Sequence, residues 1–153
     1  MTLATHIITG ALIGIKIKNP FYIVVVSVAV HFFLDILPHG DYVNKKSTLR
    51  EWWKNALDFS LGIAIILLVF LFRGLPEGAT ISNITLAIIF SLLPDFTHFL
   101  YRYLNMSFLR PIKNFHEGLH YYPNTSPERE FRLKNNLWDI FISFVSFLIL
   151  ILA

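Results

Sequence analysis

The residues of this chain that could do chemistry are its histidines and aspartates, which gather in and beside apolar segments. His31 and Asp35 are four residues apart, a spacing that places both side chains on one face of a helix. His39 and Asp41 follow directly after the same apolar segment. The other histidines and aspartates are His6, Asp58, Asp95, His98, His116, His120 and Asp139. Imidazole and carboxylate groups in such numbers predict a metal site.

The ligand types narrow the choice of metal. The chain contains no cysteine, which excludes thiolate ligands and disulfides. Histidine and carboxylate suit zinc first, with manganese or iron(II) as alternatives, whereas magnesium and calcium prefer all-oxygen ligands. The candidate ligands outnumber one four-coordinate site, which favours two ions, or one ion with carboxylates that orient the histidines. Bound ions would bring the pKa of a water to about 7, and two of them would clamp a phosphoryl group.

We assign the candidate residues two predicted roles. The predicted metal ligands are His6, His31, Asp35, His39, Asp41, His116 and His120. The predicted catalytic residues, acting as general base, as further ligands or behind the ligands, are Asp58, Asp95 and His98. Structural alternatives stay open for some of them. Asp58 and Asp139 occupy positions where a carboxylate caps a helix N-terminus. The sequence from Pro38 to Asp41 is also compatible with a plain turn.

The composition is that of a membrane protein. Of the 153 residues, 55% are hydrophobic and 15% are charged, whereas soluble domains carry about 25% charged residues. Five apolar segments cover residues 3–17, 21–37, 52–72, 81–104 and 136–152. About 20 residues span a bilayer, so the third and fourth segments suffice, while the first is short enough to be tilted or re-entrant. The chain is therefore predicted to be all-α, a single membrane-embedded domain over residues 1–153 with about five transmembrane helices.

Smaller patterns refine this prediction. Gly10 and Gly14 form a small-xxx-small pair that allows close helix packing. Residues 111–123 carry apolar side chains at helical spacing and predict an amphipathic helix in the membrane interface. A faint internal repeat places a Leu-Pro pair at 37–38 and at 93–94, each closing an apolar helix. Nothing in the amino-terminal sequence resembles the cationic region of a signal peptide.

The distribution of Lys and Arg predicts the orientation. With five spans, one face holds ten basic residues and the other face holds Lys16, Lys18 and Arg73. The ten are Lys45, Lys46, Arg50, Lys54, Arg102, Arg110, Lys113, Arg129, Arg132 and Lys134. The basic face is expected to be cytoplasmic, and every histidine and aspartate lies towards it. The net charge is +3, and the Lys and Arg residues do not form a cluster with interleaved aromatic residues of the kind typical of nucleic-acid binding.

The order of these short motifs resembles a known family. The motifs are Thr5-His6 with Gly10, His31-x-x-x-Asp35, Pro38-His39-x-Asp41-Tyr42, Leu93-Pro94-Asp95 and Phe115-His116-x-x-x-His120. They resemble small prokaryotic membrane-bound metal-dependent hydrolases, in the style of the LexA-induced inner-membrane hydrolase superfamily. The resemblance implies a helical inner-membrane protein with a His/Asp metal site and hydrolytic activity, and it implies no firm substrate. A looser likeness to the helical zinc phospholipase C and P1 nuclease group favours phosphoester chemistry by analogy.

We therefore expect a metal-dependent hydrolase that acts on a phosphoester or ester, a membrane lipid or lipid-linked substrate, at the cytoplasmic interface. Basic residues beside the site are expected to hold an anionic head group. They are Lys45, Lys46, Arg50, Arg110 and Lys113. Two other functions stay open: a transport or ion-coupling protein with a His/Asp relay, and a structural membrane protein with a metal staple. A relay predicts polar groups that reach both faces.

Overall fold

The computed structural model describes residues 1–43, 47–120 and 130–152. Six α-helices form over these residues, and the only bridge between extended segments joins Asp41 to Glu130. The helices are α1 (Leu3–Lys16), α2 (Pro20–Ile36), α3 (Trp53–Arg73), α4 (Ile81–Tyr103), α5 (Arg110–Leu119) and α6 (Leu137–Leu152). The all-α prediction is confirmed, and each predicted apolar segment forms one helix. The short helix expected over 111–123 is α5, and the last three of those residues lie outside the described part of the chain.

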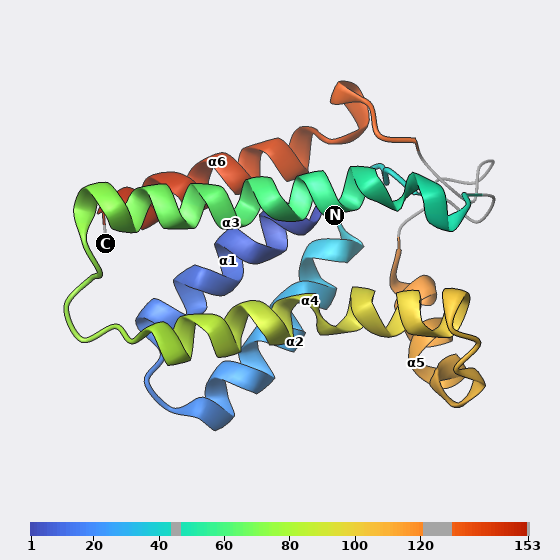
Figure 1. Cartoon of the computed structure of the whole chain (residues 1–153), viewed down its shortest axis with the longest axis horizontal. Coiled ribbons are helices and arrows are strands. Elements are labelled where there is room, and N and C mark those ends of the chain that lie inside the picture. Colours follow the sequence, from blue (N-terminus) through green and yellow to red (C-terminus); the bar gives the residue numbers. More distant parts are fainter. Residues whose placement is uncertain (44–46, 121–129, 153) are drawn as a thin grey trace.

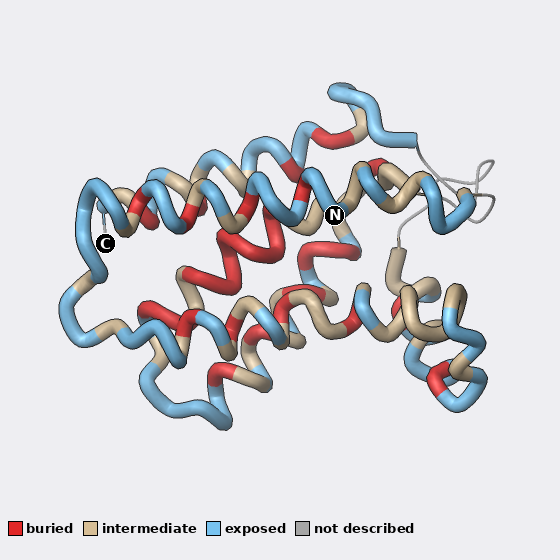
Figure 2. The backbone as a smooth tube through the Cα atoms, viewed as in Figure 1, coloured by how far each residue is buried: buried red, intermediate tan, exposed pale blue. Residues whose placement is uncertain are grey.

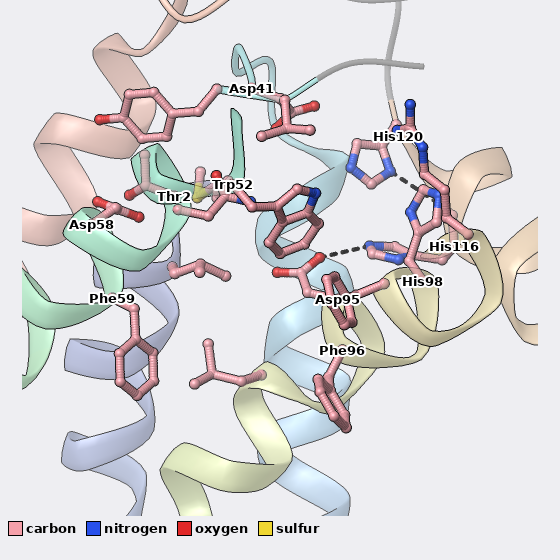
Figure 3. Close-up of a pocket in the computed structure, with 18 of the residues that line it drawn as sticks. Thr2, Asp41, Trp52, Asp58, Phe59, Asp95, Phe96, His98, His116 and His120 are labelled. Carbon is pink, nitrogen blue, oxygen red and sulfur yellow. Dashed lines mark hydrogen bonds and ion pairs between the residues drawn. The ribbon is translucent and has the colours of Figure 1, made fainter. Parts of the chain in front are cut away.

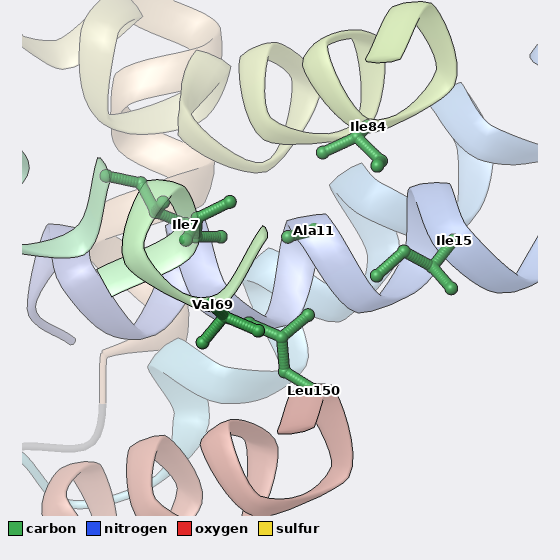
Figure 4. Packing of buried hydrophobic residues seen from close by; sticks show 7 residues of the cluster. Ile7, Ala11, Ile15, Val69, Ile84 and Leu150 are labelled. Atoms are coloured by element: carbon green, nitrogen blue, oxygen red, sulfur yellow. The ribbon is translucent and has the colours of Figure 1, made fainter. Parts of the chain in front are cut away.

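Helix α1 lies at the centre of the molecule. It packs against α2, α3, α4 and α6 (Figure 1), and its residues from Ala4 to Ala11 are buried on every side (Figure 2). The buried apolar cluster forms around the same helix (Figure 4). Its members are Ile7, Ala11, Ile15, Ile66, Val69, Ile84 and Leu150. A helix enclosed in this way also buries its polar side chains, so Thr5, His6 and Thr9 find their hydrogen-bond partners inside the bundle.

Two glycines bring α1 against α4, as their spacing predicts. A Cβ atom on Gly14 would lie 2.5 Å from the Cα of Ile84, and one on Gly10 would lie 2.7 Å from the hydroxyl of Ser91. Any larger side chain at these positions would push the two backbones apart. The close α1–α4 packing also fixes the position of Ser91 relative to α2.

The two Leu-Pro pairs behave differently. Helix α2 ends at Ile36, directly before Leu37 and Pro38, as expected of a proline that restricts the residue before it. Pro94 instead lies inside α4, which continues to Tyr103. The repeat hypothesis is therefore wrong at the second pair. Pro94 lacks an amide hydrogen, which leaves the helix locally short of one hydrogen bond rather than ending it.

The outer faces of the helices are apolar. Large apolar side chains such as Leu67, Leu71, Phe72, Phe141 and Phe144 are exposed, and such a continuous apolar surface is typical of a membrane-associated protein. Among the described residues, however, only α3 and α4 are long and apolar enough to cross a membrane. Five spans are therefore not confirmed. The physical reason is length: the 14 residues of α1 rise about 21 Å, short of a hydrocarbon core of about 30 Å.

The helices run so that their polar ends coincide. α1, α3 and α6 begin at the end of the molecule where α2 and α4 finish (Figure 1). Every histidine and aspartate falls near a helix start in the first group, near a helix finish in the second, or in the adjoining loop and α5. The antiparallel order of the helices therefore brings these side chains to one end of the structure.

Candidate metal centre

Asp35, in the last turn of α2, is the centre of the cluster and is fully buried. Its Oδ2 lies 2.8 Å from His116 Nε2 of α5 and 3.1 Å from His31 Nε2, one turn earlier in α2. Its Oδ1 lies 3.2 Å from His6 Nε2 and 2.6 Å from the amino group of Met1, both contributed by the start of the chain. These four contacts offset the free energy required to bury the charge of the Asp35 carboxylate.

Within the described part of the chain, two groups of side chains have donor atoms close enough to hold an ion. The first group contains His31, Asp35, Asp95 and His116, and the second contains Asp35, His39 and His120. In each group the donor atoms lie within 4.8 Å of one another. Donors bound at about 2 Å around one ion are separated by about 3–4 Å, so a small contraction would complete either group. Asp35 belongs to both groups, which makes it a candidate bridging carboxylate.

Three of the histidines are oriented by backbone carbonyl groups. A carbonyl oxygen only accepts, so the Nδ1 atom that faces it carries a proton, and Nε2 is the atom left to bind an ion when the ring is neutral. The acceptors are Ser91 O for His31 (2.7 Å), Leu37 O for His39 (2.7 Å) and His116 O for His120 (3.0 Å). This is the arrangement that fixes the tautomer and ring orientation of metal-binding histidines in proteins.

His39 has a feature that an ion would explain. Its Nε2 atom is buried and forms no hydrogen bond with the described residues. Burial lowers the pKa of His39 to about 3, and burial also lowers the pKa of His120. Both imidazoles are thereby kept neutral at ordinary pH, which is the form that binds a metal. A buried nitrogen that forms no hydrogen bond within the described part of the chain, in a group with the shared carboxylate, fits a ligand position better than a packing position.

The loop after α2 reaches the site because of Gly40. A Cβ atom on Gly40 would collide with the carbonyl oxygen of Glu130 and would lie 3.0 Å from Asn136 Oδ1. Asn136 Nδ2 donates to the Gly40 carbonyl at 2.9 Å, and the amide of Phe131 donates to the Asp41 carbonyl at 3.1 Å. Gly40 is therefore needed for the close approach between these two segments.

Two predicted ligands lie beside the groups rather than in them. The ring of His6 stacks on that of His31 with centroids 4.2 Å apart, and its Nε2 reaches only Asp35. Asp41 Oδ1 lies 3.5 Å from His39 Nε2, and burial raises the pKa of Asp41 to about 7. The donor atoms of His6 and Asp41 do not lie within 4.8 Å of all the donor atoms of either group. They therefore contact the ligands from behind or from the side.

Of the predicted catalytic residues, Asp95 joins the first ligand group, with its Oδ1 3.7 Å from His116 Nε2. His98, one turn later in α4, faces the same space, and its Nε2 lies 3.6 Å from Glu117 Oε1 (Figure 3). Asp58 has a different partner, since its Oδ2 accepts from the amide of Ala4 at 3.1 Å. Asp58 therefore stabilises the start of α1.

Asp139 of α6 also stabilises the start of α1. It accepts from the amide of Thr2 at 3.3 Å and from the hydroxyl of Thr5. The first amides of a helix have no partner within the helix and carry its positive dipole end, so two carboxylates from neighbouring helices satisfy both needs. The capping expected of these aspartates thus serves α1, the central helix, rather than their own helices.

A cavity of about 700 Å³ adjoins the ligands (Figure 3). Its polar lining comes on one side from α4, α5 and the residue that follows α5, and on the other side from the start of α1, the loop after α2 and the start of α3. The first set includes Asp95, His98, Arg102, His116, Glu117 and His120, and the second includes Thr2, Asp41, Asn55 and Asp58. Its apolar lining comes from α3 and α4 and includes Phe59, Ile89, Leu92, Phe96 and Phe99. The volume lies within the range of small-molecule sites, so the candidate metal centre has space for a substrate.

Arg102 is the residue that sequence reasoning missed. It was counted only for membrane orientation, yet it lines the cavity. Its spacing of seven residues from Asp95 places both on one face of α4 and could have identified it. Of the expected head-group cations, Lys113 pairs with Glu117 at 2.6 Å, and Lys45 and Lys46 lie outside the described residues. The two arginines expected to act with them, Arg50 and Arg110, do not line this cavity.

Comparison with known proteins identifies no relative: no family model matches the chain, and neither curated proteins nor solved structures give a match. The assignment of chemistry to this site therefore rests on the geometry of its residues, and the resemblance seen in the sequence motifs remains an expectation.

Proposed function

We propose that this protein is a membrane-embedded metal-dependent hydrolase that cleaves a phosphoester or ester bond. The observation that carries the proposal is the set of three histidines, each oriented by a backbone carbonyl, that belong to two ligand groups with one shared carboxylate beside a cavity. The shared residue, Asp35, supports a centre of two ions. Zinc is the first choice for this donor set, with manganese and iron(II) as alternatives.

Ions held there would activate a water and polarise the oxygen under attack, which is the chemistry that such centres supply. The remaining work falls to the residues of the chain. Arg102 lines the same cavity and is placed to neutralise an anionic substrate group. His98, paired with Glu117, faces the cavity one turn after Asp95 and is placed to accept a proton from the attacking water as a general base.

The proposed position in the membrane is inferred from the two long apolar helices and from the basic residues at the end of the structure that holds the site. α3 and α4 would span the bilayer, and the site would lie at the cytoplasmic interface because the basic residues flank it. The prokaryotic inner membrane is the compartment that the motif resemblance implies. Buried charge at one end of a bundle, with apolar outer faces, is the distribution that a site opening at the interface requires.

The alternatives receive less support from the described residues. A relay for transport requires ionisable groups towards both ends, and the buried histidines and aspartates lie at one end only. A structural staple would account for ligands that join α2, α4 and α5, but it gives no reason for a cavity lined by His98 and Arg102 beside the ligands. Hydrolysis uses both features.

The experiment that tests the proposal measures metal and activity on the full chain purified in detergent. Elemental analysis is expected to find up to two transition-metal ions per chain. Hydrolysis of bis(p-nitrophenyl) phosphate and of p-nitrophenyl acetate is then followed before and after chelation, and after return of zinc or manganese. Activity on at least one of them that is lost on chelation and restored by metal supports the proposal. A metal-loaded protein that cleaves neither substrate would favour the structural staple.

A further inference from the structure

The cavity beside the ligands has two walls of opposite character, both built into α4. Asp95, His98 and Arg102 recur every three or four residues and form a polar stripe along the helix. A second stripe runs beside it, contains only apolar side chains and lines the same cavity. It consists of Ile89, Leu92, Phe96 and Phe99. A space bounded in this way matches a molecule that is polar at one end and hydrocarbon at the other.

The apolar side of the cavity reaches the outer surface of the bundle. Phe59 of α3 and Ile89 and Phe96 of α4 line the cavity, and each is between 42% and 54% exposed. α3 and α4 both pack along α1 but make no extensive contact with each other. The close-up shows Phe59 and Phe96 on opposite sides of the space (Figure 3). The cavity is therefore open sideways between the two helices that are long enough to cross a membrane.

From this geometry we infer that the substrate is a membrane phospholipid that enters sideways between α3 and α4. One acyl chain lies in the acyl groove, which we define as Phe59, Ile89, Leu92, Phe96 and Phe99, and the phosphodiester lies between Arg102 and the ligand groups. This inference rests on the proposed function and gives it a substrate class. It commits to a lipid chain because three members of the groove, Phe59, Ile89 and Phe96, are themselves exposed on the outer faces of α3 and α4.

The position of the reacting bond follows from the same arrangement. With the acyl chain held by the groove at the level of Ile89 to Phe96, the head group can only extend towards Arg102, at the polar end of α4. Asp95 lies on the same helix between Ile89 and Arg102, at the level of Phe96. The bond presented to the metal ligands is therefore the one that joins the hydrophobic part of the lipid to its head group.

The first test maps the lipid by photo-crosslinking. The full metal-loaded chain is placed in phosphatidylcholine vesicles that contain phosphatidylglycerol with a diazirine in one acyl chain. Labelled peptides from the acyl groove are expected in the parent protein. Ile89→Trp fills the groove and should remove that label. Leu67→Trp is the matched control, because Leu67 is an exposed apolar residue of α3 that does not line the cavity. Labelling spread equally over all outer faces, and unaffected by Ile89→Trp, would overturn the inference.

The second test separates the groove from the hydrolase. The ratio of kcat/KM for long-chain phosphatidylglycerol to that for its dibutyryl form is measured for the parent, Ile89→Trp and Phe96→Ala. The ratio should fall about tenfold in each variant, the loss expected when two seated methylene groups are displaced. Phe96→Ala removes a half-exposed side chain, so it reports on the groove even if Ile89→Trp does not fold. An unchanged ratio in a variant that hydrolyses both lipids would overturn the groove and leave the hydrolase. Groove labelling in a protein that cleaves neither lipid would support the lipid seat and overturn the hydrolase.

Discussion

Asp35 Oδ2 and His116 Nε2 lie 2.8 Å apart, although 81 residues separate them in the sequence. The contact joins the end of α2 to α5, a helix that lies outside the apolar bundle core. His116 is the only buried residue of α5, and its contact with Asp35 holds α5 against α2. The contact thus links the position of α5 to the chemistry of the candidate centre.

The sharing of Asp35 predicts a characteristic pattern of metal loss. His31→Ala and His39→Ala each remove a ligand from one group, so each should lower the metal content of a two-ion protein by about one ion. Asp35→Asn removes the shared carboxylate and should lower the content by both ions, with a loss of affinity of at least about 10–100-fold. Elemental analysis after dialysis against a weak chelator measures this.

Asp139→Asn is the matched control for this pattern, since Asp139 is a buried aspartate at the same end of the bundle that belongs to neither ligand group. Its metal content should remain that of the parent. Equal losses in all four variants would mean that metal retention follows general stability, and the shared-ligand arrangement would be wrong.

The close packing of α1 on α4 predicts the effect of adding one methyl group. Gly14→Ala places a Cβ 2.5 Å from the Cα of Ile84, so the helices must separate, and the variant should be destabilised by about 1–3 kcal/mol. Gly118→Ala is the control, because nothing lies within 4 Å of its added Cβ. Thermal unfolding of both variants in the same detergent measures the difference. A Gly14→Ala protein as stable as Gly118→Ala would show that the helices do not meet so closely.

The buried state of His39 predicts a pH dependence in the metal-free protein. Burial lowers its pKa from 6.5 to about 3 in the folded state, so the unfolded chain binds a proton in this interval and the folded chain does not. Its contribution to stability is therefore complete above about pH 6.5 and is lost as the pH falls towards 3. The slope from this residue is at most about 1.4 kcal/mol per pH unit.

Comparison of His39→Asn with the parent isolates this contribution. The free energy of unfolding of the chelated proteins is measured between pH 4 and 7, and the variant should show the shallower decline on acidification. Parallel curves for the two proteins would place the imidazole of His39 in contact with water.

A contact between the α1–α2 connection and α4 predicts which side of the membrane this connection faces. Asn83 Nδ2 donates to the carbonyl of Lys18 at 3.4 Å, so the α1–α2 connection lies at the same end as the start of α4. Single cysteines at Asn19 and Glu77 should therefore label from the same side, and a cysteine at Ser47 from the other, cytoplasmic side. The chain has no native cysteine to interfere. Labelling of Asn19 and Ser47 from one side would mean that the α1–α2 pair is re-entrant.

The helices of this protein were accessible from sequence because five of them are largely apolar runs and α5 carries apolar side chains at helical spacing. The predicted segment 81–104 became α4 at Ile81–Tyr103, and Gly10 and Gly14 marked the close contact of α1 before any partner was known. Local sequence is sufficient for such features because helix formation depends on neighbours in the chain, and the four-residue spacing of small residues is a property of the chain itself. The same reasoning failed at Pro94, where tertiary packing carries the helix through a residue that locally disfavours it.

The candidate centre was only half visible in the sequence, for a physical reason. Residue types and helical spacing identified His31, Asp35 and His116 as potential ligands, because they are chemical properties of the chain itself. Three other features depend on how separate helices are placed around α1. Asp35 belongs to both ligand groups, Asp95 belongs to one of them, and Asp58 instead binds the start of α1. Placement of this kind arises from long-range packing and from single contacts, such as that between Gly40 and Glu130, whose partner lies 90 residues further along the chain. Spacing along the chain therefore supplied the ligands, and the tertiary structure alone decided which of them meet.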